Sequence, residues 1–205
     1  MKVAICTPVY HDPSYHYTVS LANLLTVSAG TSIGYFTSRG SLVALRRNLI
    51  AERALSCGAD WLLWIDADQS FPPDTLKRLL AHRLDFVGCN IPIRYDPIGP
   101  TAGRLGEDGR VRHIWTEPGN TAVEAVDVLG MGVCLVHRRV FDAMEAPWFG
   151  GTAEDHQFCL KAARAGFRPH VDHGLSWQIG HVGERMLTNQ DALDDRDRWV
   201  AKYGS

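Results

Sequence analysis

Asp66 and Asp68 stand one residue apart, directly after Trp61–Ile65, a run without charged residues. So short an apolar run predicts a strand that is buried on both faces. Two carboxylates at its end repel each other and resist loss of water unless a cation or hydrogen-bond donors compensate. Carboxylate oxygens suit Mg²⁺ or Mn²⁺, so the pair is a candidate divalent-metal site. The alternative is that both are turn and N-cap residues before a helix that begins near Pro73.

A second pair of carboxylates, Glu154 and Asp155, opens a helix predicted over 152–165, with Thr152 as its N-cap. Acidic groups in a first turn are stabilised by the helix dipole and by free N–H groups. They are candidates for a general base or an acceptor-binding carboxylate, and capping alone is the alternative. Just before these carboxylates, Trp148 and Phe149 lie between a proline and two glycines. This pattern predicts an exposed apolar platform beside Glu154 and Asp155.

Three histidines and an aspartate lie close together near the C-terminal end: His170, Asp172, His173 and His181. Such a group is a candidate supply of metal ligands, although an ordinary surface or core histidine is the alternative for each one. His181 suits a metal site best, because glycines on both sides let the backbone approach closely and a neutral imidazole completes an oxygen-rich site.

Arg46 and Arg47 lie on a helix predicted over 42–56. An arginine binds phosphate through two N–H groups at once, so either is a candidate phosphate ligand. A solvated helix face is the alternative, and it suits one of the two.

The first ninety residues alternate between strands and helices, which predicts a parallel sheet with helices on both faces. The strands are expected at 2–8, 33–37, 61–65 and 85–90, and the helices at 17–29, 42–56 and 74–82. Beyond residue 90 we expect short antiparallel strands at 111–115 and 122–126, a hairpin turn at 107–109, strands at 128–137 and 168–171, and helices at 138–144, 152–165 and 189–203. Ligands of open α/β sheets bind beyond the carboxyl ends of the strands. The Thr7–Tyr10 turn, the two aspartates and the chain after Asn90 and Val171 are expected at that edge.

Composition narrows the class of protein. The chain has 205 residues, a length that fits one domain. Its net charge of −2 differs from the excess of positive charge that is typical of a general nucleic-acid binder. No apolar run approaches the roughly 20 residues of a membrane span, and the N-terminus lacks the pattern of a signal peptide. The five cysteines stand singly, which argues against a disulfide framework or a zinc cage. We therefore expect a cytoplasmic protein with reduced cysteines.

Four segments in this order resemble the GT-A fold glycosyltransferases, close to family 2. They are VAICTPVYHD, DWLLWIDADQSFPPDTLKRLLAH, GMGVCLVHRRVFDAM and TAEDHQFCLKAARAGFRP, and the resemblance spans most of residues 2–183. It implies one Rossmann-like α/β domain over 1–205, with a mostly parallel central sheet, helices on both faces and a small antiparallel element. Within it, 1–90 would bind a nucleotide-diphosphate sugar, 91–185 would face the acceptor, and 186–205 would form a C-terminal helix.

The resemblance also implies roles for individual residues. The donor would contact Thr7, Pro8, Tyr10, Arg47 and the turn Asp66-Ala67-Asp68. Mn²⁺ or Mg²⁺ would be held by Asp68 and His181, while Asp66 would face the ribose or the metal. Asp155 would be the catalytic base if the enzyme inverts the configuration of the sugar; retaining enzymes share the same fold and metal strand. Glu154 would help to place the acceptor, which Trp148, Phe149 and Gly132 would contact. The acceptor is an unspecified hydroxyl of a saccharide, a lipid-linked sugar, a small alcohol or a modified nucleic-acid base.

Two other functions fit part of the pattern. A nucleotidyltransferase also uses an α/β sheet and a carboxylate-bound metal, but it predicts a glycine-rich loop after the first strand, where this chain has TPVYHDPSY. A non-catalytic module that binds nucleotide sugars or glycans would keep Asp68 and would need no base at Asp155.

Overall fold

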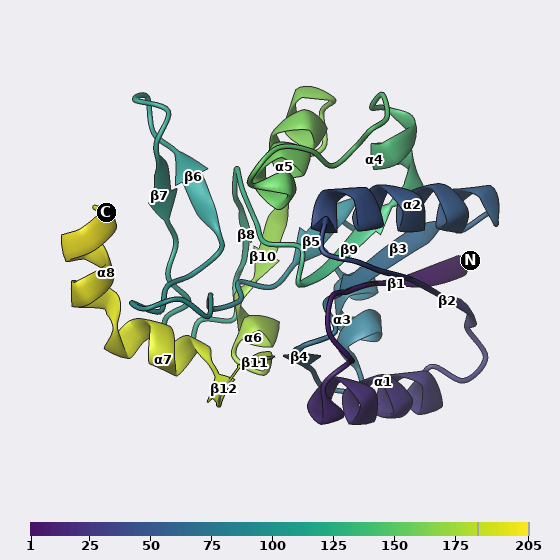
Figure 1. Cartoon of the computed structure of the whole chain (residues 1–205), viewed down its shortest axis with the longest axis horizontal. Helices are drawn as coiled ribbons and strands as arrows, with labels where there is room; N and C mark the ends of the chain where they lie inside the picture. The colour runs from purple at the N-terminus through teal and green to yellow at the C-terminus, as the bar shows by residue number, and fades with distance from the viewer. Residues whose placement is uncertain (184, 205) are drawn as a thin grey trace.

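The computed structural model describes residues 1–183 and 185–204 of the chain, and it is built on one central sheet (Figure 1). Seven strands of the described residues form this sheet in the order β2-β1-β3-β9-β5-β10-β8. Five of them point in the same direction, whereas β9 and β8 run antiparallel to their neighbours. The strands are β1 (Lys2–Val9), β2 (Ser32–Arg39), β3 (Trp61–Ile65), β5 (Phe86–Gly88), β8 (Val123–Ala125), β9 (Val133–His137) and β10 (His170–Asp172). The predicted α/β class with a mostly parallel sheet is confirmed.

The central strands bury side chains on both faces, as their apolar runs predict. In β3, Leu63 and Ile65 belong to one buried cluster and Leu62 and Trp64 to the other, because successive side chains of a strand point to opposite faces. Helices α1 (Tyr15–Val27) and α3 (Thr75–Ala81) cover the first face, and α2 (Val43–Ser56), α4 (Arg138–Asp142) and α5 (Glu154–Arg164) cover the second. The remaining helices are α6 (His173–Ser176), α7 (Asn189–Asp194) and α8 (Arg196–Tyr203).

The strand predicted over 128–137 is shorter than expected. Only β9 (Val133–His137) is a strand of the central sheet; it lies antiparallel between β3 and β5, while Val128 makes an isolated bridge to Gly103. Gly130 lies at the break, where a Cβ atom would come within 2.9 Å of the Thr101 side chain. The apolar pattern indicated burial but carried no information about the strand partner.

Two smaller sheets complete the fold. The hairpin turn predicted at 107–109 is confirmed, since β6 (Gly103–Leu105) pairs with β7 (Val111–His113) around it. A three-stranded sheet joins β4 (Gln69–Ser70), β11 (Gly180–Val182) and β12 (Met186–Leu187). This sheet was not predicted, and it brings the chain that follows Asp68 beside the chain that carries His181.

Several helix details differ from the predictions. On α2, Leu45 and Leu49 are exposed although they are apolar, and the helix buries Arg47 and Ala51 together with Ile50. The small alanine allows close packing on the sheet, and the turn of the helix then directs Arg47 toward the end of β3.

Two further predictions are wrong. Helix α5 begins at Glu154 after an N-cap at Ala153 that makes no side-chain hydrogen bond, so Thr152 is not its cap. The C-terminal helix is divided in two at Asp195. After β10 the chain forms the short helix α6, which Asp172 caps by accepting from the N–H of Leu175.

No helix in the described part of the chain is both long and apolar enough to cross a membrane. All five cysteines are free, and Cys57 is the exposed one. Neither observation identifies a compartment.

Candidate functional site

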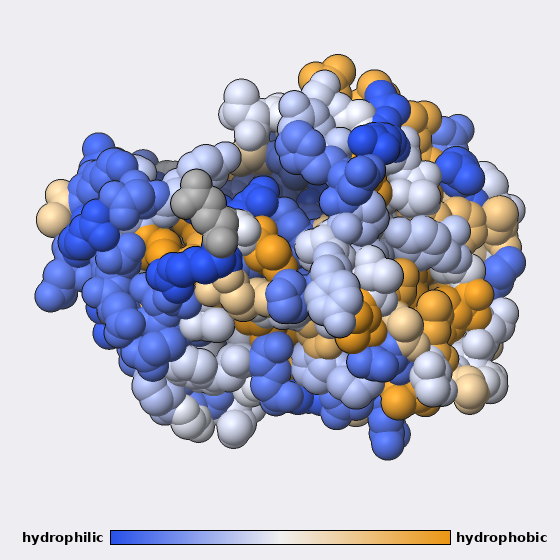
Figure 2. Space-filling model, turned by 60° about the horizontal axis from the view of Figure 1, so that its bottom comes forward, coloured by the Kyte–Doolittle hydropathy of each residue, from blue (hydrophilic) through white to orange (hydrophobic). Residues whose placement is uncertain are grey.

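Two adjoining cavities lie at the carboxyl ends of β1 and β3. The first, which we name the β1 cavity, has a volume of about 360 Å³ and is lined by the turn after β1 and by the start of α2, including Pro8, Tyr10, His11, Asp12, Ser41 and Ala67. The second, the α5 cavity, has a volume of about 550 Å³ and is lined by Arg47, Gln69, Gly132, Glu154, Asp155 and His181, among others. Four residues line both: Val43, Asp66, Asp68 and Arg94. Figure 2 shows the surface hollowed between the C-terminal helices and the body of the molecule, with hydrophilic side chains around the hollow.

Arg47 holds two carboxylates of the α5 cavity in place. Its Nη2 donates to Asp66 Oδ1 at 3.0 Å and Oδ2 at 3.2 Å, and its Nε donates to Glu154 Oε1 at 3.4 Å. The Arg47 side chain is only 3% exposed, and its Nη1 has no hydrogen-bond partner among the described residues. Glu154 is thus part of a buried ionic network, in which one nitrogen of Arg47 is buried and has no partner among the described residues.

The environment raises the pKa of Asp66 to about 6. Burial is the main cause, since it disfavours the charged carboxylate, and the nearby charge of Asp68 acts in the same direction. The guanidinium of Arg47 opposes both and keeps the pKa from rising further.

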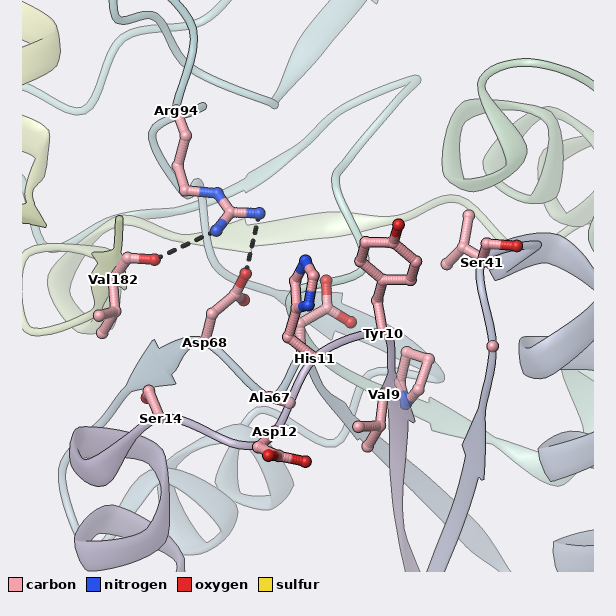
Figure 3. A pocket seen from close by; sticks show the side chains of 14 residues that line it. Val9, Tyr10, His11, Asp12, Ser14, Ser41, Ala67, Asp68, Arg94 and Val182 are labelled. Carbon is pink, nitrogen blue, oxygen red and sulfur yellow. Dashed lines mark hydrogen bonds and ion pairs between the residues drawn. The ribbon is translucent and has the colours of Figure 1, made fainter. Parts of the chain in front are cut away.

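Asp68 lies between a histidine and a second arginine. Its Oδ2 is 3.5 Å from His181 Nε2 and 3.1 Å from Arg94 Nη2. Burial favours a higher pKa for Asp68, but the hydrogen bond to His181 and the charge of Arg94 outweigh it, so the pKa is lowered. Figure 3 shows Arg94 reaching toward Asp68 from the far side of the β1 cavity.

The orientation of His181 suits a cation between it and Asp68. Its Nδ1 donates to the carbonyl of Pro92 at 2.7 Å. In the neutral ring Nε2 therefore carries the lone pair and can bind a cation, whereas the hydrogen bond to Asp68 forms only when Nε2 carries a proton. A backbone acceptor on the other ring nitrogen is the usual arrangement of a metal-bound histidine. Both oxygens of Asp66 accept from Arg47, which leaves Asp68 and His181 as the better pair of ligands.

No group of three or more His, Cys, Asp or Glu side chains in the described residues is arranged to hold a metal ion. A cation at this position would thus have two protein ligands and would take its other ligands from a bound molecule and from water. Mg²⁺ is commonly bound in this way, through few protein side chains and substrate phosphates.

The small sheet explains why Asp68 and His181 meet although they are far apart in the sequence. His181 pairs with Gln69 across β11 and β4, and the N–H of Val182 donates to the carbonyl of Asp68 at 2.8 Å. These backbone bonds fix the carboxylate and the imidazole on neighbouring strands.

Asp155 lines the α5 cavity and forms no ion pair with any described residue. Its Oδ1 accepts a hydrogen bond from the N–H of His156 at 2.8 Å. A carboxylate that makes no ion-pair contact with a described residue and lines a cavity is available to accept a proton or a hydrogen bond from a hydroxyl group.

The aromatic platform predicted at Trp148 and Phe149 is wrong. Phe149 is only 1% exposed and stacks on Phe158 at 4.5 Å, and Trp148 packs on Phe141, to whose carbonyl its Nε1 donates. Asn48 is the cause, because its side-chain amide bonds both the N–H and the carbonyl of Phe149 and holds the loop against the core. Neither aromatic residue lines the two cavities.

The first strand contributes less to the site than expected. Thr7 is fully buried and shares a 2.6 Å hydrogen bond with the Tyr17 hydroxyl, so it lies under the β1 cavity and does not line it. Pro8 and Tyr10 do line this cavity, and Tyr10 is 62% exposed.

Neither cavity is lined by His170, Asp172 or His173, and the side chains of Asp172 and His173 make structural contacts instead. Asp172 contacts His82 at 2.9 Å, and the buried His173 lies between Thr116 and Glu124. These contacts brace β10, α6 and β8, so Asp172 and His173 fit the alternative given above, that of ordinary structural residues, and not that of metal ligands.

Sequence reasoning missed two residues of the site, Arg94 and Gln69. Gln69 is 1% exposed, lines the α5 cavity, and has no partner for its Oε1 among the described residues. Gly132, the predicted acceptor contact, also lines this cavity, and a Cβ atom there would come within 2.8 Å of Ile91 Cδ1. Gln69 could have been suspected from its place directly after Asp68, whereas no pattern in the sequence distinguishes Arg94.

Comparison of the sequence with protein-family models and with curated proteins finds no match. The fold, in contrast, matches 234 solved chains. One of them is A197 from STIV, which is 17% identical and has a TM-score of 0.66; the match covers 93% of this chain and 92% of A197. At this identity the likeness shows a shared fold.

Proposed function

We propose that this protein is a glycosyltransferase that moves a sugar from a nucleotide-diphosphate sugar to an acceptor hydroxyl with the help of Mn²⁺ or Mg²⁺. The observation that carries the proposal is the pairing of Asp68 with His181 at the boundary of two cavities, with Asp155 at the wall of the second. A cation site, a donor-sized space and a free carboxylate are the parts that such a reaction needs.

The two cavities suit the two ends of the donor. The nucleoside would lie in the β1 cavity against Pro8 and Tyr10, and the sugar would lie in the α5 cavity near Gly132 and Gln69. The diphosphate would then cross the shared wall at Asp68 and Arg94. Arg47 and Gln69 both line the α5 cavity and offer N–H donors and an amide oxygen, the kinds of group that bind a polyhydroxyl ligand.

A divalent cation bound by Asp68 and His181 would stabilise the negative charge that develops on the diphosphate leaving group. Arg47 keeps Asp66 and Glu154 in fixed positions around that group. Asp155 accepts the proton of the attacking hydroxyl, in the role of a general base. Glu154 acts as a positioning residue through Arg47, since its carboxylate is already engaged.

Two substitutions separate transfer from binding. Asp68→Ala should abolish metal-dependent hydrolysis of the donor, while Asp155→Asn should leave donor binding within about threefold and slow transfer by about 10²-fold or more. Asp142→Asn, which changes an exposed carboxylate at the end of α4, is the matched control.

Full hydrolysis by the Asp68→Ala variant, or in EDTA, would contradict the metal assignment. Unchanged turnover in the Asp155→Asn variant would remove this residue as the base. Tight binding of donors without hydrolysis or transfer would favour a non-catalytic binding module instead.

A further inference from the structure

Arg94 occupies the position in which a metal ion would contact Asp68. Its Nη2 is 3.1 Å from Asp68 Oδ2, the same oxygen that lies 3.5 Å from His181 Nε2. Its Nη1 donates to the carbonyl of Val182 at 3.3 Å, so the guanidinium bridges Asp68 and β11 (Figure 3). A guanidinium and a divalent cation repel each other, and both cannot bind this oxygen closely at once.

Arg94 is able to leave this position, in contrast to Arg47. The Arg94 side chain is 48% exposed and contacts a single oxygen of Asp68. Arg47 is 3% exposed and is held by two different carboxylates. An exposed ion pair is weak and easily exchanged, whereas a buried network is not. Arg94 is thus the arginine of the site that can move, and Arg47 is the one that is fixed.

A bound diphosphate would offer Arg94 a better partner than Asp68. Arg94 lines both cavities, so a diphosphate that crosses from one to the other passes within reach of its guanidinium. Arginine binds phosphate oxygens through two parallel N–H groups, which is stronger than its present single contact with the carboxylate.

We propose that Arg94 exchanges partners when the donor binds: it pairs with Asp68 in the free protein and with the diphosphate in the complex. This inference rests on the proposed function. Its consequence is ordered binding, because the cation gains free access to Asp68 only when a diphosphate draws Arg94 away. The exchange keeps Asp68 neutralised before the donor arrives and couples cation binding to diphosphate binding.

Substitution of Arg94 by Gln tests the exchange with two binding measurements. Binding of Mn²⁺ alone, followed by the loss of the free-ion EPR signal, should be about tenfold tighter in the Arg94→Gln variant than in the wild type. Binding of radiolabelled pyrophosphate at saturating Mn²⁺, measured by equilibrium dialysis, should be about tenfold weaker in the same variant. These opposite shifts are the signature of a residue that leaves one partner for the other.

Two further variants control for charge and shape. Arg94→Lys keeps the charge but not the forked donor, so it should bind Mn²⁺ alone as weakly as the wild type and should bind pyrophosphate less well. Arg185→Gln removes a nearby positive charge that pairs with Asp191 instead, and it should change neither affinity by more than twofold.

If Arg94→Gln leaves both affinities within twofold of the wild type, or weakens the binding of Mn²⁺ alone, the exchange is overturned and the proposed function is untouched. If Arg185→Gln reproduces both shifts, the overall positive charge near the site is responsible and not the contact between Arg94 and Asp68. The exchange is then again overturned. If the folded wild type binds no Mn²⁺ even with pyrophosphate, the exchange and the metal-dependent function both fail.

Discussion

Replacement of Arg47 by Met should destabilise the protein strongly, because Arg47 is the common partner of Asp66 and Glu154. Methionine fills a similar volume, so the change removes mainly the charge and its hydrogen bonds. Loss of one partner from a buried ionic network costs about 3–5 kcal/mol, since the remaining charges stay unpaired. The Asp66 side chain is 30% exposed and Glu154 is 14% exposed, so water relieves part of this penalty. We therefore expect a loss near the lower limit, about 3 kcal/mol.

Urea denaturation measures this loss as the decrease in the free energy of unfolding. Arg46→Met is the matched control, because Arg46 is the preceding residue of the same helix and forms no ion pair with a described residue. Its loss should stay below about 1 kcal/mol. Neutralising the whole network with Arg47→Met, Asp66→Asn and Glu154→Gln should restore most of the stability, since no unpaired charge then remains.

The penalty should also depend on pH. The guanidinium lowers the pKa of Asp66, so its removal lets this pKa rise above about 6. When folding raises the pKa of a carboxyl group, the protein becomes less stable as the pH increases from the pKa of the group in the unfolded state to its pKa in the folded state. The gap between Arg47→Met and the wild type should therefore be widest above pH 7 and narrow toward pH 4. A loss below 1 kcal/mol at pH 7.5, or a triple variant as unstable as the single one, would refute this reasoning.

Two other predictions concern the site directly. Since the pKa of Asp66 is about 6, this carboxylate takes up a proton as the pH falls, and calorimetry should show Mn²⁺-dependent donor binding about tenfold weaker at pH 5 than at pH 7. Asp66→Asn should remove this pH step, and a step that persists in the variant would assign it to another group. Gly132→Ala should weaken donor binding and cost about 1–3 kcal/mol in stability, because the added methyl group lies 2.8 Å from Ile91 Cδ1 and 3.6 Å from Asp66 Oδ2. Unchanged affinity would mean that the sugar does not lie against Gly132.

Much of the fold follows from local patterns. The apolar run of β3 predicted a buried strand, because few other elements bury every residue of so short a segment. The alternation of strands and helices over the first ninety residues predicted the parallel half of the sheet. The place of Asp66 and Asp68 at the edge of the sheet follows from these elements, since a turn after a parallel strand lies at its carboxyl end.

The antiparallel half depends on contacts that no local pattern encodes. Asn90 is an example: its buried amide accepts from the N–H groups of Thr101 and Ala102 and donates to the carbonyl of Ile114 and the hydroxyl of Thr116. These bonds shape the chain that returns over the site and carries Arg94. A single Asn after a strand gives no sign of four partners so distant in sequence.

The wrong prediction at Phe149 has the same origin. A segment with Pro, Trp, Phe and two glycines is typical of an exposed loop, but Asn48 on α2 holds its backbone against the core. His181 was identified correctly as the residue beside Asp68, although the β4–β11 pairing that joins them was not predicted. For Phe149 and for His181, contacts between segments distant in the sequence determine whether the side chain lines a cavity.

The central claim is that Asp68 and His181 bind a cation that is needed for a nucleotide-diphosphate sugar to bind. The most direct test is thermal unfolding of the wild type, Asp68→Ala and His181→Ala with a panel of nucleotide sugars, in the presence of Mn²⁺ or of EDTA. A donor at 100 times its Kd stabilises the folded state by about 2.7 kcal/mol, which for a chain of this size raises Tm by roughly 5–10 °C. We predict such a rise for at least one nucleotide sugar, in the wild type and with Mn²⁺ only. An equal rise in EDTA or in both variants, or no rise with any nucleotide sugar, would contradict the claim.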